Sequence, residues 1–104
     1  MEKIVCAANW YKSFPLIENE APVGFTRPIN CHEGIVFCGL RHHNCLHQMI
    51  SITGKTQSEM GNEVQGFLTT RNRFVDRKEG ALIWLAQGGT LEYSDERLFS
   101  EDLY

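Results

Sequence analysis

The apolar run Gly34–Leu40 constrains the fold more than any other stretch of the sequence. It passes directly into four polar residues, Arg41, His42, His43 and Asn44. A short apolar run bounded by glycine predicts a buried strand, and the abrupt change to polar side chains predicts that a helix begins where this strand ends. Directional donors at a strand-to-helix junction form a common kind of site for anions and small ligands. The sequence therefore places a candidate site at this junction.

The residues after this junction predict an amphipathic helix. Four residues have the spacing that places them on one face of a helix: Leu46, Met49, Ile50 and Thr53. We expect the helix to begin near His43 or Asn44 and to end at Gly54. The polar stretch that follows, from Lys55 to Glu63, predicts a mobile connection.

Further strands are predicted on both sides of this unit. Ile4–Tyr11 is apolar enough for the interior of a sheet, and Val64–Thr69 with Arg73–Val75 flanks a short polar turn, which predicts a β-hairpin. Three prolines, Pro15, Pro22 and Pro28, exclude a helix or an inner strand between Lys12 and Glu33. We expect a long ordered loop there, with a short extended piece at Val23–Thr26, that serves function or a subunit contact.

A second helix is predicted from the hairpin onward. Asp76 as N-cap and Glu79 three residues later form a capping box, worth about 1 kcal/mol. The helix runs to about Gln87, and its buried face is predicted to be Ala81, Leu82, Leu85 and Ala86. Gly80 in the first turns either tolerates strain or permits a close backbone approach. The fold class is α+β: a small, mostly antiparallel sheet with two main helices in a single domain of 104 residues.

The last residues, from Thr90 to Tyr104, are acidic but contain the apolar pairs Leu98–Phe99 and Leu103–Tyr104. One interpretation is a solvated acidic tail. The other is a tail that docks on the domain or on a neighbouring subunit, which the terminal apolar residues favour. A chain this small also has surface to spare for a partner, so we expect a homo-oligomer.

Composition excludes several classes of function. The net charge of −3 argues against bulk nucleic acid as a partner. No apolar run approaches the roughly 20 residues of a membrane span, and the first residues lack the layout of a signal peptide, so we expect a cytoplasmic protein. The four cysteines are then expected to be reduced thiols.

Basic side chains are concentrated in eight positions, at Arg71, Arg73, Arg77 and Lys78. Arginine binds phosphate through two parallel hydrogen bonds, so this cluster together with Arg41 indicates an anion site. The alternative is a solvated hairpin tip whose charges balance the acidic tail. Phe67 and Phe74 belong in part to the core, although one of them could present a ring face to a base.

Potential metal ligands also gather in one span: Cys31, His32, Cys38, His42, His43, Cys45 and His47. No Cys-x-x-Cys pair is present and Cys38 lies in an apolar strand, so we expect no metal. No phosphate-loop, nucleophile-elbow or metalloprotease pattern appears either. The leading alternative to a binding protein is a small metal-dependent phosphodiesterase or hydrolase using His42, His43 and His47. A third alternative is a protein-interaction module that works through the tail.

Three blocks of sequence resemble the first type of Thoeris anti-defence protein, a family of small phage-encoded sponges. The blocks are Gly39–Cys45, Gln65–Thr69 leading to Arg73–Glu79, and Leu98–Tyr104. The resemblance implies a binding protein without a cofactor rather than an enzyme. It further implies sequestration of cyclic ADP-ribose isomers made by TIR-domain sensors and, for some members, of cyclic oligonucleotides. The sites would be shared between subunits of a dimer or a higher assembly such as a hexamer, in the infected host cell.

The resemblance also implies roles for particular residues. Arg41 would meet a phosphate and Phe67 would stack on the base. Asp76 would contact the ligand at the helix cap, with Arg77 as a second cation. The complete set of candidate ligand-binding residues is Arg41, His42, His43, Phe67, Arg73, Phe74, Asp76 and Arg77. The chain departs from the family at Gly80, where Ala is usual, and at Asp76, where Asn is as common; a carboxylate accepts hydrogen bonds but cannot donate them.

Overall fold

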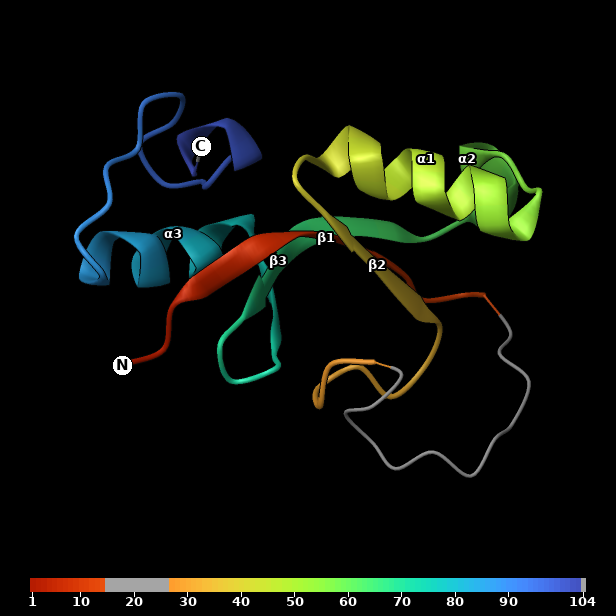
Figure 1. Ribbon diagram of the computed structural model, residues 1–104, viewed down its shortest axis with the longest axis horizontal. Helices are drawn as coiled ribbons and strands as arrows, with labels where there is room; N and C mark the ends of the chain where they lie inside the picture. The colour runs from red at the N-terminus through yellow and green to blue at the C-terminus, as the bar shows by residue number, and fades with distance from the viewer. Residues whose placement is uncertain (15–26, 104) are drawn as a thin grey trace.

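Four antiparallel strands form one sheet in the order β2-β1-β3-β4 in the computed structural model, which describes residues 1–14 and 27–103 (Figure 1). The strands are β1 (Ile4–Tyr11), β2 (Ile35–Gly39), β3 (Glu63–Thr69) and β4 (Phe74–Asp76). The predicted strands and the hairpin between β3 and β4 are confirmed, and Asn72 takes the left-handed conformation (φ 56°) that its turn requires. The extended piece expected at 23–26 lies outside the described residues.

Two main helices, α1 (His42–Thr53) and α3 (Arg77–Ala86), lie on the same face of the sheet. α1 packs over β2 and β1, whereas α3 packs over β3 and β4. This arrangement confirms the predicted α+β class. Short helices are α2 (Gln57–Met60) and the 3₁₀ turn η1 (Ser100–Asp102).

The buried face of α1 differs from the prediction. The buried residues are His42, Cys45 and Met49, while Ile50 is 39% exposed. The helix begins at His42 because the Asn44 side-chain oxygen accepts a hydrogen bond from the Arg41 backbone N–H (2.9 Å) and closes the first turn. The Cys45 thiol then faces the carbonyl of Ala7 (3.6 Å), which turns this side of the helix toward the sheet. The predicted end at Gly54 is confirmed (φ 71°).

The predicted buried face of α3 is confirmed at Ala81 but is wrong at Leu82, Leu85 and Ala86. Leu82 is 69% exposed and Leu85 47% exposed, whereas Gly80 and Ala81 face the sheet. A Cβ atom at Gly80 would lie 3.1 Å from Cδ2 of Phe67, so the helix approaches the sheet through its smallest residues, as expected for a close backbone approach. Asp76 caps the helix by accepting from the Glu79 N–H (2.8 Å), but the Glu79 side chain bonds to Arg73 instead of closing the capping box.

The segment predicted as a mobile connection, Lys55–Glu63, contains the helix α2. Its capping box is complete, because Thr56 accepts from the Glu59 N–H (3.3 Å) and Glu59 accepts from the Thr56 N–H (3.0 Å). Met60 is buried in the main core. The prediction missed this helix because a single turn has no hydrophobic period to detect.

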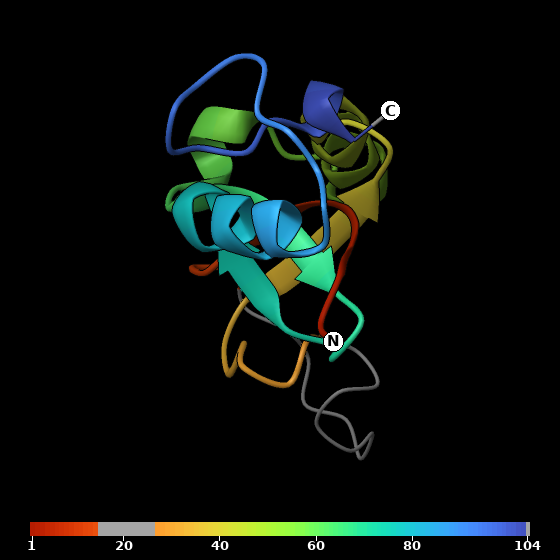
Figure 2. The same ribbon diagram turned by 90° about the vertical axis from the view of Figure 1, so that its left-hand side faces the viewer.

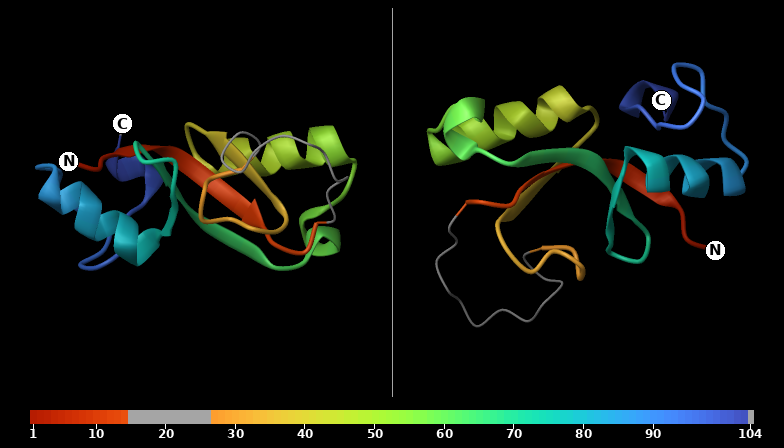
Figure 3. Two further views of the ribbon diagram at one scale, coloured as in Figure 1. Left: turned by 90° about the horizontal axis from the view of Figure 1, so that it is seen from below. Right: turned by 180° about the vertical axis from the view of Figure 1, so that it is seen from behind.

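The sheet is covered on both faces. The larger core lies between the sheet and the helices and includes Tyr11, Met49 and Phe67. A smaller core on the opposite face contains Ala8, Cys31 and Phe74. Residues 27–33 run along that opposite face (Figure 3), where Asn30 exchanges two hydrogen bonds with the Phe74 backbone (2.7 and 2.8 Å).

The acidic tail docks on the domain. Residues 90–103 return over α3 and reach toward the start of α1 (Figure 2). Leu98 is fully buried, and its backbone N–H donates to the Arg77 carbonyl (2.9 Å). Of the two interpretations of the tail, docking on the domain describes residues 90–103, because the buried Leu98 and Ser100 anchor it.

Candidate functional site: an arginine pocket beneath the tail

Arg77, the first residue of α3, is the centre of the candidate site. Its Nη2 donates to the side-chain oxygen of Gln65 (2.7 Å) and its Nη1 donates to the carbonyl of Leu98 (3.0 Å). Its guanidinium lies 4.6 Å from the ring centroid of Phe99, a cation–π contact. Every described group in direct contact with this cation is therefore neutral.

The buried side chain of His42 contacts Arg77. The imidazole is 8% exposed, and its Nε2 lies 2.9 Å from the carbonyl of Gly66, so Nε2 carries the proton and donates. The other nitrogen, Nδ1, is left as an acceptor and lies 3.4 Å from Nη2 of Arg77. Burial lowers the pKa of His42, and the nearby Arg77 cation lowers it further. The ring is thus held neutral in one tautomer.

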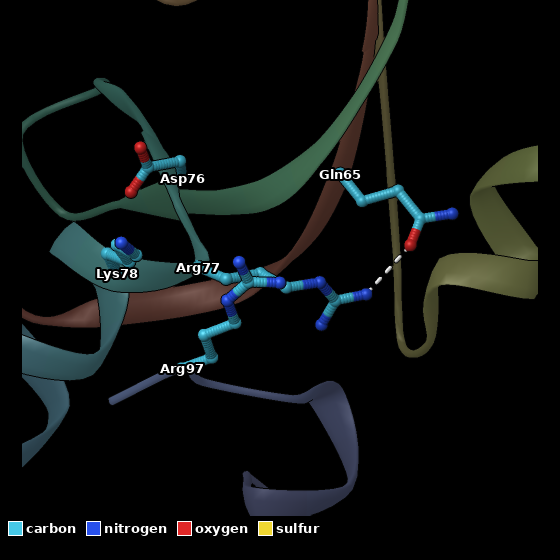
Figure 4. Close-up of a pocket in the computed structure, with 5 residues that line it drawn as sticks. All are labelled: Gln65, Asp76, Arg77, Lys78 and Arg97. Atoms are coloured by element: carbon cyan, nitrogen blue, oxygen red, sulfur yellow. Dashed lines mark hydrogen bonds between the residues drawn. The ribbon is translucent and has the colours of Figure 1, made fainter. Parts of the chain in front are cut away.

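A cavity of about 220 Å³ opens beside these residues (Figure 4). It is lined by Gln65, Asp76, Arg77, Lys78 and Arg97. Burial lowers the pKa of Arg77, the nearby charge of Glu101 opposes this effect, and the positive charge of Arg97 adds a smaller lowering. Three cations and one carboxylate thus gather in a protein whose net charge is −3. The N-terminus of α3 adds a partial positive charge at the same place.

Arg41 contacts the tail at Ser100. Its Nη1 donates to the carbonyl of Ser100 (2.6 Å), so it helps to hold the segment that carries Arg97. Arg41 is not among the residues that line the cavity. Glu101 lies near Arg41, and its pKa is lowered mainly by a hydrogen bond from the Ser100 hydroxyl, with a smaller contribution from the Arg41 charge.

Arg73 does not take part in the pocket. Its Nε and Nη2 donate to the two oxygens of Glu2 (2.9 and 2.8 Å), and Nη2 also lies 3.2 Å from Glu79. Neither carboxylate is among the residues that line the cavity. The sequence cluster of basic residues is therefore divided in space: Arg77 and Lys78 line the cavity, and Arg73 forms ion pairs.

The predicted stacking residues do not face a ligand. Phe67 is fully buried under Gly80 and meets the edge of His42 (centroids 5.2 Å apart), and Phe74 is 6% exposed on the opposite face of the sheet against Trp10. Neither ring presents a face to solvent, because both faces of the sheet are covered. The ring that contacts Arg77 is instead that of Phe99, and the exposed Tyr93 contacts Phe99 edge to face.

The three histidines do not converge. His43 and His47 lie on the exposed side of α1 with ring centroids 6.4 Å apart, whereas His42 points inward to Gly66. Within residues 1–14 and 27–103, no group of three His, Cys, Asp or Glu side chains is placed to hold a metal ion. A second hollow, of about 390 Å³, lies on α1 beside His47 and Ile52 and is lined by none of the arginines.

A model of the phage T4 y16D protein family matches residues 3–104 of this sequence. The chain belongs to the phage T4 y16D protein family. Every residue that lines the arginine pocket lies within the matched span. No curated protein and no solved structure matches the chain. In the described part of this y16D-family protein, no helix has the length and apolar character to cross a bilayer.

Sequence reasoning missed two residues of the pocket, Gln65 and Arg97, and noted Lys78 only as part of the basic cluster. A signal for Arg97 was present, because it is the sole basic residue from Thr90 to Tyr104. A single basic residue in an acidic tail that docks on the domain is a candidate for binding the same anion as the basic cluster. Gln65 carried no such signal, since its role depends on the position of Arg77 across from β3.

Proposed function

We propose that this phage protein binds a small phosphorylated signal of nucleotide type in the arginine pocket and sequesters it without degrading it. The observation that carries the proposal is that Arg77 has no direct carboxylate partner among the described residues, although the nearby charge of Glu101 offsets part of its own. This half-buried cation is bonded only to neutral groups among the described residues, and Arg97 brings a second positive charge close to it. A phosphate would relieve that repulsion through charge-assisted hydrogen bonds.

The other lining groups favour a nucleotide over inorganic phosphate. The Asp76 carboxylate, which accepts the cap hydrogen bond through Oδ1, has its second oxygen available as an acceptor for a sugar hydroxyl or a base N–H. A carboxylate would weaken binding of a bare polyanion but suits a ligand that carries both phosphate and hydroxyl groups. Phe99, which lies against the Arg77 guanidinium, and Tyr93, which contacts Phe99, would offer apolar ring surface for a base.

The size of the cavity supports a site shared between subunits. At about 220 Å³ it is smaller than the roughly 300–1,000 Å³ of a pocket that encloses a whole ligand. One phosphate with its adjacent sugar fits, and the remainder of the ligand would extend beyond the pocket. We therefore propose a homo-oligomer, a dimer or a higher assembly, in which a neighbouring copy completes the enclosure.

The sequence resemblance to Thoeris anti-defence sponges supplies the identity of the ligand within this proposal. Cyclic ADP-ribose isomers, or cyclic oligonucleotides, combine phosphates, sugars and bases in one molecule. Their capture in the cytoplasm of the infected host would keep the signal from its receptor and inhibit host immunity. Sequestration requires affinity and no turnover, so the protein would act without a catalytic residue, cofactor or metal.

The test is titration calorimetry of the full chain with cyclic ADP-ribose isomers and with cyclic di- and trinucleotides, followed by chromatography of the ligand released by heat. We expect saturable binding of at least one of these ligands and recovery of the same compound unchanged. Arg77→Ala should weaken binding roughly 10-fold or more, and Arg73→Ala, four residues away, is the matched control that should retain it. A hydrolysed product, or equal binding by Arg77→Ala and the parent, would overturn the proposal.

The shared site has its own test. Light scattering at micromolar concentration should give a mass of at least two chains for the unliganded protein. A monomer that binds one ligand tightly would contradict a site completed by a neighbour, while leaving the arginine pocket as the binding site.

A further inference from the structure

Gln65 lies between a carboxylate and the cation of the arginine pocket. Glu63 and Gln65 are two residues apart in β3, so their side chains belong to the same face of the sheet. The β1 residues directly opposite them are Tyr11 and Asn9, and Tyr11 belongs to the core between the sheet and the helices. Both side chains therefore point toward the helices, on the side where Arg77 begins α3.

The amide of Gln65 bonds to both neighbours at once. Its Oε1 accepts from Nη2 of Arg77 (2.7 Å; Figure 4), and its Nε2 donates to Oε1 of Glu63 (2.9 Å). A guanidinium has only donors and a carboxylate only acceptors, so the amide satisfies both in a single orientation. We call Glu63, Gln65 and Arg77 the amide relay, because a neutral group joins the carboxylate to the cation.

Glu63, at one end of the amide relay, is itself fixed in place. Gln57 in the short helix α2 donates through Nε2 to both carboxylate oxygens of Glu63 (3.0 Å each). The complete capping box of α2 and the buried Met60 hold that helix on the domain. The carboxylate therefore stays at the far end of the Gln65 amide and does not meet Arg77 directly.

The amide relay leaves Arg77 oriented but not neutralised. Nη2 lies beside two neutral acceptors, the Gln65 oxygen and Nδ1 of His42, and Nη1 donates to the Leu98 carbonyl. Nε of the same guanidinium has no hydrogen-bond partner among the described residues. Glu101 offsets part of the charge from a distance, without a hydrogen bond or an ion pair to Arg77.

We propose that Gln65 is a positioning residue of the arginine pocket, whose neutral amide orients the Arg77 guanidinium and keeps the Glu63 carboxylate from pairing with it. This inference rests on the proposed function of the pocket. A phosphate then competes with a neutral amide oxygen for Arg77 instead of with a carboxylate, which forms the stronger hydrogen bond. Arg73 shows the other outcome, since Glu2 reaches it and occupies its donors.

A variant that relocates the carboxylate tests this role. Glu63→Gln combined with Gln65→Glu moves the negative charge to the position that contacts Arg77. The net charge stays at −3, and each hydrogen bond of the amide relay keeps a donor and an acceptor. Titration calorimetry with cyclic ADP-ribose isomers and with cyclic di- and trinucleotides should give a dissociation constant roughly 10-fold or more above that of the parent, because the phosphate must displace a carboxylate.

A ligand-free measurement tests the same relay. Urea unfolding of the parent and of the relocated variant, each with and without Arg77→Ala, gives the coupling between positions 65 and 77. Arg77→Ala should destabilise the relocated variant more than the parent, because it leaves a half-buried carboxylate without its partner instead of a neutral amide. This comparison needs no ligand, so its outcome is separate from that of the proposed function.

Two single variants serve as controls, with circular dichroism confirming that each is folded. Gln87→Glu adds a negative charge outside the cavity lining and keeps an acceptor for the Ile4 N–H, which bonds to Oε1 of Gln87 (2.9 Å), so it should bind as the parent does. Glu63→Gln alone should also retain binding, since Gln65 still accepts from Arg77.

Two results would overturn the role of Gln65: equal affinity of the relocated variant and the parent, or an equal cost of Arg77→Ala in both. A parent protein that binds none of the probes would contradict the proposed function instead, and the unfolding comparison would then decide the role of Gln65.

Discussion

Arg73 and Arg77 lie four residues apart and carry the same group, yet the fold uses them in opposite ways. Arg73 forms a two-bond ion pair with Glu2 and a third contact with Glu79, so its charge is balanced within the chain. Arg77 makes its direct contacts with Gln65, Leu98, Phe99 and His42, and none of these groups carries a negative charge. The partners available after folding, rather than the residue type, decide whether a cation holds the structure together or remains to meet a ligand.

The pKa shifts of Glu2 and Arg77 show the same contrast between the two arginines. The hydrogen bond from Arg73, with a second from Thr69, lowers the pKa of Glu2 to about 2. The pKa of Arg77 is lowered instead, because burial outweighs the opposing charge of Glu101 and the charge of Arg97 lowers it slightly further. One arginine is in a favourable electrostatic environment and the other is in an unfavourable one. Substitutions should therefore separate stability from binding.

The largest expected effect is on ligand binding at Arg77. Arg77→Ala removes a charge-assisted contact to phosphate worth about 1.5–3 kcal/mol, so the dissociation constant should rise roughly 10- to 150-fold. Arg77→Lys keeps the charge but loses the planar fork and should recover only part of the affinity. Calorimetry with the ligand identified for the parent measures both, and an Arg73→Ala variant that lost binding equally would remove the distinction between the two arginines.

The reverse experiment concerns stability at Arg73. Glu2→Gln or Arg73→Ala should lower the free energy of unfolding by about 1–2 kcal/mol, since the Glu2 side chain is 11% exposed. The folded pKa of Glu2 lies below its ordinary value of 4.5, so its contribution is complete above about pH 4.5 and is lost as the pH falls toward 2. Urea unfolding across this range should show a weaker pH dependence for Glu2→Gln than for the parent. Lys55→Ala, which removes an exposed cation that is not among the groups acting on Glu2, serves as the control.

A smaller effect is expected at His42, which supports Arg77. The folded pKa of His42 lies below its ordinary value of 6.5, so the folded protein resists protonation. The contribution to stability is therefore complete above about pH 6.5 and declines as the pH falls below it. The groups that face the ring are Arg77, Glu101, Glu63 and the Gly66 carbonyl. His42→Gln should cost about 1 kcal/mol at neutral pH and flatten this part of the stability profile.

Identical unfolding profiles for the parent and His42→Gln between neutral and mildly acidic pH would contradict a neutral, buried imidazole. The other three histidines are common to both proteins, so the difference between the two profiles isolates His42. An unchanged ligand affinity in His42→Gln would further show that Arg77 holds its position without this contact.

The smallest effects are expected at the rim of the pocket. Lys78 and Arg97 are exposed, and exposed charge contacts are worth about 0.2–1 kcal/mol, so each alanine variant should weaken binding by roughly 1.5- to 5-fold. The loss should shrink at high salt, because salt screens exposed charges. Arg71→Ala, an exposed cation away from the cavity, should not change binding. Equal losses for all three variants would indicate attraction by net charge instead of a defined pocket.

Local sequence patterns were enough to predict much of the framework. The apolar run before Arg41, the alternation around the Thr70–Asn72 turn and the cap at Asp76 each act through neighbours within a few residues, and each predicted element is present. The close approach at Gly80 was also foreseen, since only a glycine or a similarly small residue permits it. The burial of Ile50, Leu82 and Leu85 was not predicted correctly, because the rotation of a helix on a sheet is set by contacts with other elements.

The candidate site could be predicted only in part from the sequence. The sequence by itself determined that arginines cluster near a helix start and that an acidic tail ends in apolar residues. Only the tertiary structure decided that Arg73 pairs with Glu2, which is 71 residues away, and that the buried Leu98 brings Arg97 to Arg77. The physical reason is range: caps, turns and strand patterns depend on nearby residues, whereas the balance of a charge depends on whichever groups the whole fold places beside it.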